Sequence, residues 1–123
     1  MKKLIAAAFA IAGLSYAMLA QQVKAVQTAK ISTPTVGCED CKKRIETYLK
    51  RYDGIIFINV NWRRKETTVK YITDRINIEE IKTAIANAGY DADDVPANPD
   101  SYKRLPQTCK KPEDGGHPKG KVQ

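Results

Sequence analysis

The feature that most constrains the fold is a cysteine pair, Cys38 and Cys41, between a strand-like run and an amphipathic helix. The run from Val26 to Thr33 combines β-branched residues with polar alternation and stops at Pro34, which predicts a strand. After the pair, apolar side chains recur at helical spacing as far as Tyr52. This spacing puts Cys41 on the inward face of the first helical turn and Cys38 one turn earlier, in the loop.

A hairpin is predicted next. Residues 55–62 and 67–72 are rich in β-formers, and the charged residues 63–66 separate them. With strict alternation, Ile56, Ile58, Val60 and Trp62 would share one face of the first strand, and Val69 and Tyr71 would share a face of the second.

A second helix should follow the hairpin. Asn77 with Glu80 three positions later forms a capping-box pattern, and Ile76 with Ile81 forms a hydrophobic staple across the same turn. Gly89 is the natural end of this helix. We expect a last strand at residues 90–95, although the three aspartates in this segment are poor strand formers.

The order strand, helix, strand, strand, helix, strand predicts an α+β protein with the ferredoxin-like βαββαβ sandwich, in which two helices cover an antiparallel four-stranded sheet. We place this domain at residues 21–97. A short helix capped by Asn98 and Pro99 should run through Leu105, and residues 106–123 should be a flexible tail. The segment 98–123 carries Cys109 and the only histidine, His117.

Residues 1–20 resemble a secretory signal peptide. Lys2 and Lys3 precede an apolar run of 11 residues, Leu4 to Leu14, and small residues then allow cleavage after Ala17 or Ala20. The run is too short for a membrane span, which needs roughly 20 residues. We therefore expect a periplasmic or secreted protein, with no stable membrane insertion after cleavage, in an oxidising compartment.

The charge of the chain indicates solvated surface rather than nucleic-acid binding. The formal net charge is +7, and the basic residues are scattered without the aromatic and glycine spacing of an RNA or single-strand platform. We expect no nucleic-acid partner, although the basic face could steer an acidic partner protein.

The two thiols suit soft-metal chemistry. Thiolates favour Cu(I), Zn(II) and similar ions, and a two-thiolate site leaves Cu(I) or Hg(II) open to attack by a third thiolate. The helix N-terminus with Lys42 and Lys43 should lower the thiol pKa values, whereas the acidic residues Glu39 and Asp40 should oppose this lowering. Cys109 is either a third ligand, an intermolecular partner or a free thiol.

Besides the binding of a mobile ion, three other roles stay open for the cysteine pair: an inert disulfide, thiol-disulfide exchange and a structural zinc site. An inert disulfide across four residues would gain little loop entropy. A thiol-disulfide exchange protein should have more strands before the pair than this chain provides. A structural zinc module would use Cys38, Cys41, Cys109 and His117.

The run Thr35-Val36-Gly37-Cys38-Glu39-Asp40-Cys41, followed by Ile45-Glu46, the hairpin and Ala88-Gly89-Tyr90, resembles the heavy-metal-associated domain. This family includes periplasmic mercury-binding proteins, copper chaperones and the N-terminal modules of metal-pumping ATPases. The resemblance implies that Cys38 and Cys41 are the metal ligands and that Tyr90 approaches the site from the second helix. Many members have Met where this chain has Val36. Valine keeps an apolar side chain at this position under the loop.

These observations predict an exported, non-enzymatic carrier or scavenger of a soft metal ion, with Cu(I) the first choice and Hg(II) the next. Zn(II) is the third ion considered. A metal-transporting membrane protein or another metallochaperone would be the protein partner.

Overall fold

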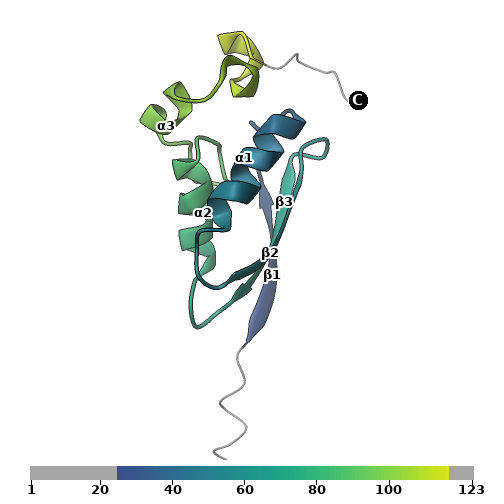
Figure 1. The fold of residues 1–123 in the computed structure, drawn as a ribbon, viewed down its shortest axis with the longest axis vertical. Helices are drawn as coiled ribbons and strands as arrows, with labels where there is room; N and C mark the ends of the chain where they lie inside the picture. The colour runs from purple at the N-terminus through teal and green to yellow at the C-terminus, as the bar shows by residue number, and fades with distance from the viewer. Residues whose placement is uncertain (1–24, 117–123) are drawn as a thin grey trace, which may run out of the picture.

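The computed structural model describes residues 25–116, which form two helices over one face of a small sheet, with a C-terminal extension above them (Figure 1). The helices and strands are β1 (Val26–Ser32), α1 (Glu39–Leu49), β2 (Ile55–Asn61), β3 (Glu66–Ile72), α2 (Ile78–Asn87), α3 (Pro99–Lys103), and the 3-10 turns η2 (Gln107–Cys109) and η3 (Pro112–Asp114). Residues 1–20, where we expect a signal peptide, and His117 lie outside the described residues. Within residues 25–116 no helix is both long enough and apolar enough to cross a membrane.

The sheet has the strand order β1-β3-β2, and both pairings are antiparallel. The central strand β3 turns Thr67, Val69 and Tyr71 inward, and all three are buried. Ile45 and Leu49 of α1 and Ile81 and Ile85 of α2 pack into the same core. The inward side chains of the strand and the apolar faces of the helices therefore pack together as the sequence predicts.

Strand β2 departs from strict alternation at Ile56. Ile55 pairs with Tyr71 and Phe57 pairs with Lys70, so Ile56 is one extra residue, a β-bulge. The bulge leaves Ile56 55% exposed and Phe57 49% exposed. The prediction that Ile56 shares a face with Val60 is therefore wrong, whereas Val60, beyond the bulge, is buried as expected.

The predicted fourth strand is replaced by a turn, so the sheet of residues 25–116 has three strands rather than four. Ala92 and Val95 form an isolated bridge around Asp93, whose φ of +51° is left-handed. The Asp93 N–H donates to the Ser32 carbonyl at 2.8 Å, and the Ser32 N–H donates to Asp93 Oδ1 at 2.7 Å. The Asp93 carboxylate thus accepts the hydrogen bond that the backbone carbonyl of a neighbouring strand would accept. Asp side chains commonly compete with regular structure for backbone hydrogen bonds in this way.

The ends of α2 follow the sequence signals. The Asn77 side chain accepts from the Glu80 N–H at 2.9 Å, and the Asn77 N–H donates to the Glu80 carboxylate at 3.0 Å, which completes the predicted capping box. Gly89 ends the helix with a φ of +107°. A side chain at this position would also meet Leu105, whose atoms lie 3.0 to 3.1 Å from an ideal Cβ.

Residues 98–116, here called the C-terminal segment, fold back over the end of the helical layer where α1 begins (Figure 1). Asn98 caps α3 as predicted, accepting from the N–H groups of Asp100 and Ser101. Beyond it, the Tyr102 hydroxyl bonds the Asp114 carboxylate and accepts from the Lys111 N–H at 2.9 Å. The described part of the predicted tail, residues 106–116, thus forms two 3-10 turns joined by hydrogen bonds.

Candidate metal centre

Cys38 and Cys41 lie at the start of α1, after the loop that connects it to β1. Cys38 is the N-cap residue, with φ −157° and ψ 168°, and its side chain makes no capping hydrogen bond. The Lys42 N–H donates to the Cys38 carbonyl at 3.2 Å and begins the helix. Cys41 is fully buried on the inward face, whereas Cys38 is half-buried. Both positions agree with the helical spacing in the sequence.

The loop before the cysteine pair is held by a buried side chain and by hydrogen bonds to two other segments. Val36 is fully buried, as expected of an apolar plug. The Lys65 ammonium donates to the Val36 carbonyl at 3.1 Å, and the Thr35 hydroxyl accepts from the Asp91 N–H at 3.1 Å. No sequence pattern predicts the Lys65 contact, because nothing local links the hairpin turn to a loop 29 residues earlier.

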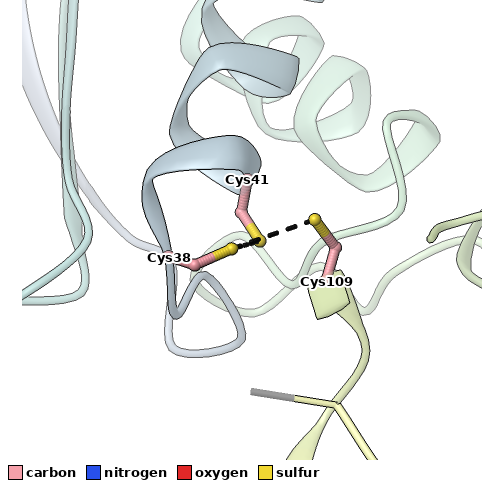
Figure 2. Close-up of side chains that lie close together, drawn as sticks. All are labelled: Cys38, Cys41 and Cys109. Carbon is pink, nitrogen blue, oxygen red and sulfur yellow. Dashed lines mark hydrogen bonds between the residues drawn. The ribbon is translucent and has the colours of Figure 1, made fainter. Parts of the chain in front are cut away.

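Three sulfur atoms converge at this loop (Figure 2). Cys38 Sγ lies 2.6 Å from Cys41 Sγ and 4.0 Å from Cys109 Sγ, and all three atoms lie within 4.8 Å of one another. All three cysteines are free thiols. Among residues 25–116 this is the one group of three or more Cys, His, Asp or Glu side chains with metal-binding geometry.

Cys109 reaches the pair from the C-terminal segment, 71 positions after Cys38. It ends the turn η2, where its N–H donates to the Pro106 carbonyl at 2.9 Å, and its side chain is only 1% exposed. The Cys38 thiol also lies 3.9 Å from the Thr108 carbonyl oxygen. The sequence left the role of Cys109 open, and the fold places its thiol beside the pair.

Tyr90 lies beside the thiols, as the family resemblance implies. The residue is fully buried, and its hydroxyl has no hydrogen-bond partner within the described part of the chain. Burial, and then the proximity of Cys41 and Cys109, raises the pKa of this hydroxyl. Tyr90 therefore carries a neutral donor that faces sulfur.

The pKa of the Cys41 thiol is raised, not lowered as the helix N-terminus led us to expect. Burial is the main cause, followed by hydrogen bonds with Cys109 and Cys38, and a backbone hydrogen bond from Gly37 opposes them only in part. Taking the thiol out of water outweighs the helix dipole, because desolvation penalises the charged form directly. A metal ion that binds here must displace this proton.

The two acidic residues between the cysteines point elsewhere. The Glu39 carboxylate accepts from the Trp62 indole N–H at 3.0 Å. Asp40 lines a groove between α1 and the C-terminal segment, together with Lys43, Arg44 and Arg104. Neither acid belongs to the sulfur cluster, so the donor set is sulfur, which favours soft ions.

The fold and the sulfur cluster together define a small α+β domain with a thiol site for a soft metal ion. The family model of the heavy-metal-associated domain matches residues 22–91, more than half of the chain. The chain therefore belongs to the heavy-metal-associated domain family.

Two proteins of known function are similar in sequence to part of this chain. The copper chaperone CopZ of Staphylococcus haemolyticus is 28% identical over 61 residues, which cover 50% of this chain and 90% of CopZ. A copper-exporting P-type ATPase of Staphylococcus aureus is 30% identical over 80 residues, which cover 65% of this chain and 10% of the ATPase. The match thus spans about a tenth of the length of the ATPase.

Solved structures agree on the fold. A CopZ metallochaperone is 26% identical and superposes with a TM-score of 0.52, covering 54% of this chain and 98% of that one. Oxidised MerP from Ralstonia metallidurans CH34 is 22% identical, with a TM-score of 0.53, covering 55% of this chain and 94% of that one. The family match ends at residue 91, so the C-terminal segment with Cys109 lies outside it.

Proposed function

We propose that this protein is a non-enzymatic carrier or scavenger of a soft metal ion, bound between Cys38 and Cys41. The observation that carries the proposal is the pair of free thiols, 2.6 Å apart, at the first turn of α1 in a heavy-metal-associated domain. The functions of the relatives, a copper chaperone and a copper-exporting ATPase, favour Cu(I) as the cargo. Hg(II) is the next candidate and Zn(II) the third, because soft thiolates suit them as well.

The site suits an ion that must be bound and passed on. Zn(II) prefers four ligands, whereas Cu(I) is satisfied by few thiolates and exchanges them with an incoming thiolate. The half-buried Cys38 sulfur is the accessible one, and the buried Cys41 sulfur anchors the ion from beneath. An incoming ligand would therefore displace Cys38 first.

The proposal is tested by anaerobic titration of reduced protein with Cu(I) against a chromophoric chelator. We expect one ion per chain, bound tightly by the wild type and not by the double variant Cys38→Ser, Cys41→Ser. Thr47→Ala, an exposed position on α1, is the matched control and should bind as the wild type does. Unchanged affinity in the double variant would rule out the assigned site.

Export and delivery are part of the same proposal. The basic start and short apolar run of residues 1–20 support a periplasmic or secreted protein. Its protein partner would be a metal-transporting membrane protein or another metallochaperone, in keeping with the kinds of relative it has. Intact mass of the exported protein should show a start at Met18 or Gln21, and recovery of protein that begins at Met1 would contradict export.

A further inference from the structure

We propose that Cys109 is a third metal ligand, so that the C-terminal segment completes a three-thiolate site and covers it. This inference rests on the proposed function, since it concerns an ion already held by Cys38 and Cys41. It goes beyond the family match, which ends at residue 91. It also assigns a role to a segment that the two-cysteine site does not use.

The sulfur positions fit three-coordination. Three sulfurs placed around one ion at about 2.3 Å, a typical metal–thiolate length, lie about 4 Å from one another in a trigonal plane. Cys38 and Cys109 already have this separation, 4.0 Å, and all three sulfurs lie within 4.8 Å of one another. The 2.6 Å between Cys38 and Cys41 must widen, and rotation of the half-buried Cys38 side chain is the movement required.

The C-terminal segment is anchored so that Cys109 is held in place. Leu105 packs against Gly89, at the end of α2, so closely that any side chain on the glycine would meet it. On the far side of Cys109, the Tyr102 hydroxyl joins Asp114 and the Lys111 N–H, and Gln107 donates to the Asp114 carbonyl at 2.6 Å. Cys109 therefore sits between two fixed points, which reduces the entropy lost when it binds an ion.

Simple burial of a small apolar side chain is the competing role for Cys109, because free cysteines are often buried. The convergence of its sulfur with the other two, 4.0 Å from Cys38 Sγ, argues against it, and Tyr90 shows that the cluster can accept a hydrogen bond. The fully buried Tyr90 hydroxyl makes no hydrogen bond of normal geometry among residues 25–116 and lies beside the thiols of Cys41 and Cys109. Buried polar groups normally have partners, and a metal-bound thiolate is a strong acceptor for this donor.

A third thiolate in the same chain changes what the site does with its ion. A partner's thiolate would no longer meet an open position on Cu(I), because Cys109 occupies it. The partner's thiol would have to compete for the ion with the Cys109 thiol. Because Cys109 belongs to the same folded chain, its effective concentration at the ion is high. The C-terminal segment thus biases the protein toward retention, because delivery must break one more metal–thiolate bond after Cys38 is displaced.

X-ray absorption of the full chain loaded with one Cu(I) gives the sulfur coordination number directly. We expect three sulfurs in the wild type and two in Cys109→Ser. Thr108→Ala, an exposed neighbour whose side chain is not part of the cluster, should keep three. Affinity for Cu(I) should fall at least about tenfold in Cys109→Ser, since loss of even an outer-shell partner usually costs about 10- to 100-fold. Transfer of Cu(I) to a thiol chelator should be faster in this variant.

Two sulfurs in the wild type would overturn the inference, and this measurement needs no variant to fold. Three sulfurs retained in Cys109→Ser would also overturn it, because the third sulfur would then come from another molecule. Either result leaves the proposed function standing if the Cys38→Ser, Cys41→Ser variant loses tight binding. Tight binding in that double variant would instead refute the proposed function itself.

Discussion

The hydroxyl of Tyr90 is buried without a hydrogen-bond partner within residues 25–116, although its ring is a full member of the core. An unpaired buried donor costs about 1 to 3 kcal/mol of stability. The residue is thus unfavourable for the metal-free fold and suited to the loaded site, where a thiolate can accept from it. Two properties of one side chain can therefore be separated by experiment.

We predict opposite effects of Tyr90→Phe on stability and on binding. Without the unpaired hydroxyl, the free energy of unfolding of the metal-free protein should rise by about 1 kcal/mol, the lower end of that cost. The affinity for Cu(I) should fall, because a donor to the thiolates is lost. Urea unfolding and chelator competition measure the two effects.

Tyr71→Phe is the matched control for this prediction. The Tyr71 hydroxyl donates to the Gln27 side chain at 3.3 Å in the sheet. The control should lose about 0.5 to 1.5 kcal/mol of stability and keep its metal affinity. A clear loss of stability in Tyr90→Phe would show that its hydroxyl has a partner in the metal-free protein.

Among the secondary-structure elements, strand β2 shows best how local pattern and register can disagree. The alternation of its β-formers predicts Ile56 on the same face as Ile58 and Val60, and the bulge turns Ile56 outward while the other two stay on the inner side. A bulge depends on how two strands pair, which the pattern of one strand does not contain. The missing fourth strand has a similar origin, because the reciprocal hydrogen bonds between Asp93 and Ser32 form only when two segments 61 residues apart meet.

We predict that Ile56→Thr changes the free energy of unfolding by less than about 0.5 kcal/mol, as exposed substitutions usually do. Val60→Thr, with the same replacement at a position 1% exposed, should cost about 1 to 3 kcal/mol because it buries an unpaired hydroxyl. Chemical denaturation of both variants gives the comparison. Equal losses at the two positions would mean that the strand alternates without a bulge.

The described residues share one continuous core, most of which lies outside the sulfur cluster. The buried residues of the three strands and the helices α1 and α2 form one cluster, and Leu105 and Cys109 of the C-terminal segment join it. Modules built on structural zinc are unfolded without their metal. We therefore expect a carrier that takes up its ion after folding, and the behaviour of the metal-free protein distinguishes it from a zinc-built module.

We predict that reduced, metal-free protein keeps its helical circular dichroism and unfolds cooperatively on heating. Added Cu(I) should raise the midpoint by mass action, with about 2.7 kcal/mol of stabilisation when the free ion is about 100 times its dissociation constant. The Cys38→Ser, Cys41→Ser variant should show no such rise. A metal-free chain that folds only when zinc is added would identify the zinc-built module instead.

The sequence by itself determined the features that depend on neighbours along the chain: the periods of β1, α1 and α2, the capping box at Asn77, and the placement of Cys38 in the loop and Cys41 on the inner helical face. These follow from backbone geometry that repeats about every two or 3.6 residues. The tertiary structure alone decided the bulge at Ile56, the turn at Asp93, the raised pKa of Cys41 and the position of Cys109. Each of these results from burial or from contacts between residues far apart in the chain, for which no local pattern carries a signal.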